Sequence, residues 1–178
     1  TALALRLTPM SLLRNTVFRR AARSLDETAA VMFTSGSTGA PKGVVLTQQN
    51  ILSNIQSLSM IFQLRSGDVL LGVLPFFHSF GYTATLWFPL LTGFKAVYHT
   101  NPLDSRTIGA LCREHRVSFL IATPTFISAY IRKIPKEDFA ALRFAIAGAE
   151  KLRPEVAAAF EEKFGVPILE GYGCTELS

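Results

Sequence analysis

The sequence predicts an α/β fold with a mainly parallel sheet and helices on both of its faces. Three observations support this fold class. Short apolar runs alternate with longer helical patterns from about Thr28 onward. The apolar runs are nearly continuous, which is typical of parallel strands buried on both faces. The chain has 178 residues and a hydrophobic content of 49%, which is enough to bury a core.

The apolar runs are expected to be strands, and the helical patterns between them are expected to be helices. The expected strands are Ala30–Thr34, Val44–Leu46, Val69–Pro75, Lys95–His99, Ser118–Thr123, Phe144–Ala147 and Ile168–Glu170. The expected helices lie near Gln48–Phe62, Tyr82–Leu91, Ser105–His115, Thr125–Lys133 and Pro154–Phe164.

Local signals mark the ends of three of these helices. Thr47 and Asp104 are placed to cap the amino-terminal ends of two helices with their side-chain oxygens. Pro154 suits a first helical turn, and Gly165 is placed to close the same helix. The segment Lys133–Asp138, which is charged and contains a proline, is expected to be an exposed connection.

Basic residues are concentrated at the amino-terminal end of the chain. The formal net charge is +5, with 18 Lys and Arg against 13 Asp and Glu. Five arginines precede the first acid, Asp26, and from Ser24 onward basic and acidic residues are equal in number. A nucleic-acid-binding protein would carry its basic residues on the face of the fold, with aromatic residues placed for stacking. The sequence shows no such pattern, so no nucleic-acid partner is expected.

Residues 1–28 are expected to form a basic linker or interdomain leader. Their leucines and arginines could also form an amphipathic helix on a membrane surface, although Pro9 interrupts the pattern. The arginines run through the apolar region instead of preceding it, which disfavours a secretory signal. No apolar run approaches the roughly 20 residues that span a bilayer. Cys112 and Cys174 lack the spacing of a metal site or a disulfide framework, which favours a reducing, cytoplasmic setting.

The strongest motif follows the first expected strand. It reads Thr34-Ser35-Gly36-Ser37-Thr38-Gly39-Ala40-Pro41-Lys42-Gly43. Glycines allow the backbone to present N–H groups to an anion, the hydroxyl groups can donate to phosphate oxygens, and Lys42 adds a positive charge. The motif therefore predicts a polyphosphate-binding loop. The alternative is a flexible Gly/Ser hairpin loop, which is less typical because a lysine behind a proline leads at once into another apolar strand.

Two other enzyme classes are excluded by spacing. A P-loop needs four residues between its glycines, followed by Lys and then Ser or Thr, and it leads into a helix. Here two residues separate Gly36 from Gly39, and Lys42 is followed by Gly43 and an expected strand. A serine-hydrolase elbow, G-x-S-x-G, occurs nowhere in the chain.

The loop Thr34–Gly43 resembles the phosphate-binding loop of the adenylate-forming superfamily, which includes acyl-CoA synthetases, luciferases and adenylation domains. Two later segments agree with this resemblance in the expected order. Ala147–Leu152 resembles the segment that lines the adenine and acyl pocket, and Glu170–Glu176 resembles the Tyr-Gly-x-Thr-Glu motif. The resemblance implies that residues 29–178 form an AMP-binding domain fragment, part of the N-terminal domain of such an enzyme. The implied nucleotide-binding residues are Thr34, Ser35, Gly36, Ser37, Thr38, Gly39, Lys42, Gly148, Ala149, Glu150, Gly171, Tyr172 and Gly173.

The resemblance also implies individual roles and two cofactors, ATP and Mg²⁺. Tyr172 would flank adenine, Thr175 would bond the α-phosphate, and Glu176 would help to hold Mg²⁺, with Thr34 as a second metal ligand. Oxygen ligands of this kind suit a hard cation. Without its motif, Glu176 would be interpreted as an ordinary surface carboxylate.

His78 lies in the run Leu74–Gly81, directly after an expected strand, where α/β sheets place their ligands. A single histidine among aromatic residues is usually a packing residue. The resemblance implies instead that His78 borders the carboxylate of the substrate in a positioning role. It need not act as a base, because a carboxylic acid is already ionised at neutral pH.

The run Pro75–Gly81 and the segments 147–151 and 168–172 look most similar to the acyl-carrier-protein synthetase half of bacterial 2-acylglycerophosphoethanolamine acyltransferases. The resemblance implies a fatty acid substrate, an acyl-carrier protein or CoA as acceptor, and a parent protein on the cytoplasmic side of the inner membrane. Residues that bind ribose and assist adenylation lie further downstream in the superfamily, so this chain alone is expected to bind nucleotide weakly and not to turn over. A non-catalytic nucleotide- or lipid-binding module of the same fold remains the alternative.

Overall fold

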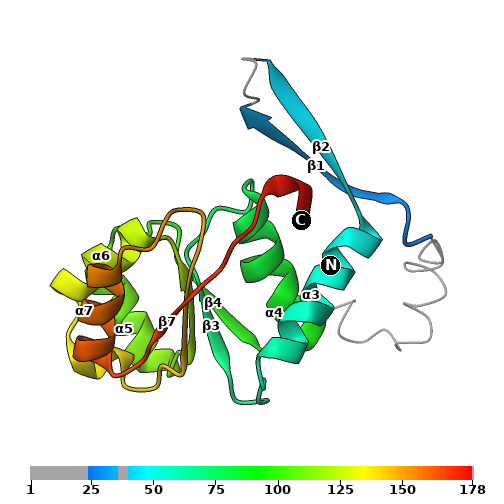
Figure 1. The fold of residues 1–178 in the computed structure, drawn as a ribbon. Coiled ribbons are helices and arrows are strands. Elements are labelled where there is room, and N and C mark those ends of the chain that lie inside the picture. The colour runs from blue at the N-terminus through cyan, green and yellow to red at the C-terminus, as the bar shows by residue number, and fades with distance from the viewer. Residues whose placement is uncertain (1–23, 36–39, 178) are drawn as a thin grey trace.

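The computed structural model describes residues 24–35 and 40–177. Its centre is a five-stranded sheet in the order β4-β3-β5-β6-β7, in which all neighbouring strands are parallel (Figure 1). The strands are β3 (Val69–Gly72), β4 (Lys95–Tyr98), β5 (Phe119–Ala122), β6 (Phe144–Ala147) and β7 (Ile168–Glu170). Each lies within an expected strand, so the predicted mainly parallel sheet is confirmed.

Helices cover both faces of this sheet, as predicted (Figure 1). One face packs against α5 (Ser105–His115), α6 (Pro124–Lys133) and α7 (Pro154–Phe164), and the other against α3 (Gln48–Ile61), the π-helix η1 (Gly81–Trp87) and α4 (Phe88–Thr92). Two short 3₁₀ helices, η2 (Lys136–Phe139) and η3 (Thr175–Leu177), complete the elements. Within residues 24–35 and 40–177, none of the helices is long and apolar enough to cross a bilayer.

The strand order places the ligand-binding edge of the sheet. In chain order the strands run β3, β4, β5, β6, β7, so the chain moves first to one side of β3 and then to the other. In doubly wound sheets, ligands bind beyond the carboxyl ends of the strands, where the order reverses. That position lies beside the carboxyl ends of β3 and β5.

The predicted helix ends are confirmed. Thr47 accepts a hydrogen bond from the Asn50 backbone N–H at 3.2 Å, and its own N–H donates to the Asn50 side chain. Asp104 accepts from the Thr107 backbone N–H at 3.2 Å. Pro154 is the first residue of α7, and Gly165 closes that helix in the left-handed conformation. These caps satisfy backbone groups that would otherwise be orphaned at the helix ends.

The predicted helix Tyr82–Leu91 was wrong in its geometry, because the chain forms the π-helix η1 followed by α4. The physical reason is Pro89, the second residue of α4. Proline has no N–H and cannot donate to the carbonyl four residues earlier, which belongs to Thr85. That carbonyl instead accepts a hydrogen bond of 2.8 Å from the Tyr98 hydroxyl. π-Helical turns are frequent at functional sites.

The first two strands, β1 (Thr28–Ser35) and β2 (Pro41–Thr47), form a separate antiparallel ribbon. The expectation that they are buried on both faces was wrong. Met32 and Leu46 are buried on one face, whereas Phe33 is 75% exposed on the other. A two-stranded ribbon turns alternate residues to opposite faces, and only one face of this ribbon packs on the remainder of the described chain. Figure 1 shows the ribbon extending away from the main sheet.

The segment Lys133–Asp138 is only partly the exposed connection that was predicted. Ile134 and Asp138 are buried, while the residues between them are exposed. Asp138 is buried because its carboxylate forms an ion pair of 2.5 Å with Arg113 on α5. A buried carboxylate requires a partner of this kind.

Candidate functional site

A cavity of about 830 Å³ opens at the carboxyl edge of the sheet. Its walls come from the segments that follow β3, β6 and β7, from α3 and η1, and from Thr34 on β1. Ile121 and Ile146 of the sheet, with Ala84 and Phe88 from the helical layer, form an apolar part of the wall. Segments far apart in the sequence therefore meet at the position where the strand order predicts a ligand.

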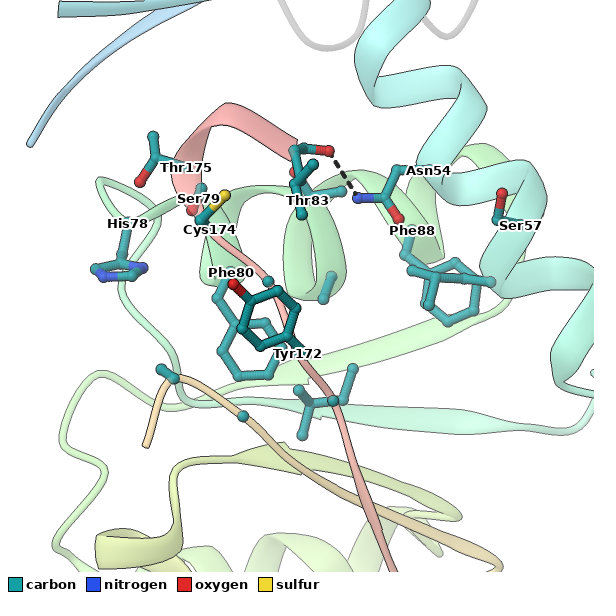
Figure 2. A pocket seen from close by; sticks show the side chains of 18 of the residues that line it. Asn54, Ser57, His78, Ser79, Phe80, Thr83, Phe88, Tyr172, Cys174 and Thr175 are labelled. Carbon is teal, nitrogen blue, oxygen red and sulfur yellow. Dashed lines mark hydrogen bonds between the residues drawn. The ribbon is translucent and has the colours of Figure 1, made fainter. Parts of the chain in front are cut away.

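The segment after β7 supplies five predicted residues to the cavity: Gly171, Tyr172, Gly173, Thr175 and Glu176. The Gly171 N–H donates to the Ala147 carbonyl at 2.7 Å, which holds this segment beside the end of β6. The Tyr172 side chain is 93% exposed, so one ring face is free to stack on a flat ligand (Figure 2). Glu176 is likewise exposed.

The segment after β6 contains three predicted residues, of which two line the cavity and one does not. Gly148 lines the cavity, and a Cβ at this position would lie 2.8 Å from the Phe80 ring, so a larger residue would displace Phe80. Ala149 also lines the cavity and has a φ of 67°, which is strained for alanine. Glu150 lies outside the cavity wall, and its carboxylate accepts a hydrogen bond of 2.6 Å from the Thr125 hydroxyl.

The ribbon β1–β2 brings the ends of the predicted phosphate loop to the cavity. Thr34 lines the cavity and pairs across the ribbon with Lys42. Directly paired residues of an antiparallel ribbon project from the same face, so Lys42 shares the ribbon face of Thr34, where it is exposed, but it does not line the cavity. β2 also packs against η3, which carries Thr175 and Glu176. The predicted residue Ser35 is the last residue of β1.

The centre of the predicted loop falls outside the described residues. These positions are Gly36, Ser37, Thr38 and Gly39. The described residues on either side of them are Ser35, the last residue of β1, and Ala40, which directly precedes β2.

His78 lines the cavity and is exposed, in the segment that leaves the carboxyl end of β3 (Figure 2). Its backbone carbonyl accepts a hydrogen bond from the Tyr82 N–H at 2.9 Å, which fixes it directly before η1. The imidazole is thus placed on the same wall as Ser79 and Phe80. This position fits the predicted role of orienting a ligand.

Sequence reasoning missed a polar row on α3. Asn50, Ser53, Asn54 and Ser57 line the cavity together. Their spacing of three and four residues puts them on one helix face, opposite the core residues Ile51 and Ile55. The Asn54 side-chain amide donates to the Leu177 carbonyl at 3.3 Å, linking α3 to η3 (Figure 2). The helical period in the sequence contained this signal, but only the apolar positions were interpreted.

The oxygen groups of the cavity fit a magnesium–nucleotide ligand. Thr34, Thr175 and Glu176 line the same cavity and provide two hydroxyl groups and one carboxylate. In the part of the chain that the structure describes, no cluster of three or more His, Cys, Asp or Glu could hold a metal by itself. Mg²⁺ prefers oxygen ligands and commonly combines one or two carboxylates with substrate phosphates. The donor set therefore suits Mg²⁺ that arrives with a nucleotide.

The fold and the cavity define an α/β protein with a ligand site at the carboxyl edge of a parallel sheet. The family model of the AMP-binding enzyme matches residues 8–178. The chain therefore belongs to the AMP-binding enzyme family, the adenylate-forming superfamily that the sequence motifs indicated.

Individual proteins and structures support this assignment. The chain is 31% identical over 156 residues to a long-chain-fatty-acid–CoA ligase of Bacillus subtilis (strain 168), covering 84% of this chain and 27% of the relative. It is 33% identical over 158 residues to a medium-chain fatty-acid–CoA ligase of Escherichia coli (strain K12), covering 86% and 27%. The structure of O-succinylbenzoate coenzyme A synthetase from Bacillus subtilis, in complex with ATP and magnesium ion, superimposes with a TM-score of 0.78 at 28% identity, covering 87% and 32%.

The chain thus spans only 27% of the length of each of these two curated relatives. The likeness places its fold within the N-terminal domain of adenylate-forming enzymes. Both curated relatives are named as fatty-acid–CoA ligases.

Proposed function

We propose that this chain is the nucleotide-binding part of an ATP-dependent acid–thiol ligase that activates a fatty acid. The observation that carries the proposal is the meeting of Thr34, Tyr172, Thr175 and Glu176 at one cavity, with Lys42 on the same face of the neighbouring ribbon. The reaction joins a carboxylate to the α-phosphate of ATP and releases pyrophosphate, and the acyl group then passes from the adenylate to a thiol with release of AMP. The acid–thiol ligases among its relatives support this assignment.

Each site residue has a separate role in this reaction. The exposed face of Tyr172 receives the adenine ring by stacking. The Thr175 hydroxyl donates to the α-phosphate, and Lys42 with the loop neutralises the pyrophosphate that leaves. Glu176 and Thr34 would hold Mg²⁺ through oxygen ligands, and the bound ion would further neutralise the phosphate charge. Attack brings two anions together, so positioning and charge neutralisation provide most of the rate acceleration.

His78 and the apolar wall hold the acid. The imidazole orients the carboxylate toward the α-phosphate, and the hydrocarbon part packs on Ala84, Phe88 and Ile146. Burial of each methylene against such a wall contributes about 0.8 kcal/mol. A long alkyl group therefore binds more tightly than a short one until the wall is covered.

The acceptor is proposed to be the phosphopantetheine thiol of an acyl-carrier protein or of CoA. The local resemblance around Pro75–Gly81 favours a carrier protein and a parent that also carries a lysophospholipid acyltransferase, acting on the cytoplasmic side of the bacterial inner membrane. The basic leader, residues 1–28, would then join the two activities or lie on the membrane surface.

The test is AMP formation by the full-length ligase that contains this chain. The protein is mixed with ATP, Mg²⁺ and a fatty acid, and then with CoA, phosphopantetheinylated carrier protein or carrier protein lacking its thiol arm. Sustained AMP release with one thiol acceptor, and none with the carrier that lacks the thiol, is expected. AMP release that ignores both the acid and the thiol would overturn the proposal.

A further inference from the structure

The Thr83 hydroxyl group is unusual among the residues that line the cavity. Thr83 lies on η1 and is only 2% exposed, and its Oγ1 is buried without a hydrogen-bond partner among the described residues. Three other residues in the described ranges have such an atom, namely Trp87, His99 and Ser105. None of these three lines the cavity, whereas Thr83 does (Figure 2).

Two other hydroxyl groups in the described helices, for example, have hydrogen-bond partners. Thr85, two residues later on η1, donates to the Gly81 carbonyl at 2.7 Å, and Ser57 on α3 donates to the Ser53 carbonyl at 3.0 Å. These bonds to the preceding turn are the usual solution for a hydroxyl within a helix. Thr83 lacks one although it belongs to the same π-helix as Thr85. A buried hydroxyl without a partner destabilises the protein, so a native structure that retains one calls for an explanation.

The cavity that Thr83 lines has an apolar part from the sheet, η1 and α4, and a polar part from α3. Ala84, Phe88 and Ile146 offer hydrocarbon surface, and Asn54 and Ser57 offer polar groups. A plain alkyl chain would cover the hydrocarbon and leave the Thr83 hydroxyl unsatisfied. A change of the Thr83 side-chain rotamer moves the hydroxyl to the position that the methyl group occupied, so the hydroxyl can meet a polar ligand atom in the cavity.

We infer that Thr83 is a specificity-determining residue which hydrogen-bonds a hydroxyl or oxo group on the hydrocarbon part of the acid. The substrate class is then an oxygen-substituted fatty acid, held by apolar contacts along its chain and by one polar contact at Thr83. This inference rests on the proposed ligase function, since it concerns the acid that the cavity selects. A site built to bond a substrate oxygen discriminates against the analogue that lacks it.

The test compares acids that differ only in the oxygen substituent. Octanoate and a series of monohydroxy- and oxo-octanoates, substituted at different carbons, are assayed for acid-dependent pyrophosphate exchange by the full-length ligase. The wild-type protein is expected to prefer one or two substituted acids over octanoate by kcat/KM. Thr83→Val, which keeps the shape and removes the hydroxyl, is expected to lower that preference on the order of tenfold and to leave exchange with octanoate in place.

Thr85→Val is the matched control, because it removes a partnered hydroxyl from the same helix outside the cavity wall. It is expected to leave the preference unchanged. Exchange with octanoate but with no preference for any substituted acid, or a preference that Thr83→Val does not reduce, overturns the inference and leaves the ligase function standing. Absence of exchange with every acid instead contradicts the ligase function itself.

Thermal unfolding of the ligand-free protein gives a second readout. Thr83→Val removes an unsatisfied buried hydroxyl and is expected to raise the Tm by about 3 °C, whereas Thr85→Val removes a satisfied one and is expected to lower the Tm. A lower Tm for Thr83→Val would mean that the hydroxyl already has a partner in the empty protein. That result would overturn the inference even if selectivity changed.

Discussion

The Tyr98 hydroxyl donates a hydrogen bond of 2.8 Å to the Thr85 carbonyl. In an α-helix this carbonyl would accept from the backbone N–H of residue 89, but that residue is Pro89, which has none. The Tyr98 ring passes so close over Gly72 that a Cβ there would lie 2.4 Å from it. One side chain at the end of β4 thus ties the sheet to the π-helix η1, and η1 carries part of the cavity wall.

Replacement of Tyr98 by phenylalanine is expected to lower the free energy of unfolding by about 1 to 3 kcal/mol, because the Thr85 carbonyl would lose its partner. Burial raises the pKa of Tyr98, so its hydroxyl remains a protonated donor throughout the neutral range. Urea denaturation measures the change. Tyr82→Phe is the control, since among the described residues the Tyr82 hydroxyl has no hydrogen bond, and a change below about 0.5 kcal/mol is expected there. Equal effects at both positions would contradict the role of Tyr98.

Asp68 is expected to make the free energy of unfolding depend on pH in the acidic range. Burial alone would raise the pKa of its carboxyl group, but hydrogen bonds from the Arg65 N–H and the Ser118 hydroxyl oppose this effect. The Arg143 guanidinium, 2.6 Å away, adds a hydrogen bond and a positive charge, and the pKa falls below its usual value near 3.8. A depressed pKa in the folded state stabilises the protein above the unfolded-state pKa, and this stabilisation is lost as the pH falls through the folded-state pKa.

We therefore expect the free energy of unfolding to decline as the pH falls below about 4, and Asp68→Asn to flatten this decline. At pH 7 the same substitution is expected to cost about 3 kcal/mol, because Arg143 loses its partner. Glu162→Gln, on the exposed face of α7, is the control and should leave both quantities unchanged. Urea denaturation at several pH values gives both quantities. A pH profile for Asp68→Asn that follows the wild type would refute this assignment.

Substitution of Ala149 by glycine is expected to stabilise the protein, whereas alanine-to-glycine substitutions usually destabilise one. Its φ of 67° is costly for alanine and free for glycine, so Ala149→Gly should raise the free energy of unfolding by about 0.5 to 1 kcal/mol. Ala158→Gly, on the exposed face of α7, should lower it by about 1 kcal/mol. Parallel urea titrations compare the two variants. Destabilisation by both substitutions would show that Ala149 is not strained.

The two cysteines are expected to differ sharply in reactivity. Burial, with a contribution from the Asp138 charge, raises the pKa of Cys112 to about 12, so at pH 8 only about one thiol in ten thousand is ionised. Cys174 is exposed and lines the cavity. Iodoacetamide should therefore label Cys174 first, and ATP with Mg²⁺ should slow this labelling. Peptide mass spectrometry reads out the site, and labelling of Cys112 at a similar rate would contradict the prediction.

The sequence predicted the sheet and the helix caps because each depends on local patterns, whereas the roles of the motif residues stay predictions. Ile168–Glu170 and Ser105–His115 were placed to the residue, since apolar runs and capping residues mark them directly. The π-helix was missed because its cause combines Pro89 with a hydroxyl on Tyr98, which only the folded chain brings near. The Thr83 hydroxyl was missed for the same reason, since the lack of a partner is a property of packing. The hydrogen bond between Glu150 and Thr125 could not be predicted either, because the two residues are far apart in the sequence and meet only in the folded chain.

Acid-dependent exchange of labelled pyrophosphate into ATP tests the central claim most directly, because it reports formation of the acyl-adenylate without any acceptor. With Mg²⁺ and folded full-length protein, the wild type should exchange only when a fatty acid is present. Glu176→Gln should abolish this exchange, whereas Glu161→Gln, on the exposed face of α7, should retain it. A non-catalytic module of the same fold would bind nucleotide equally well with either substitution. No fatty-acid-dependent exchange by the wild-type protein would contradict the account.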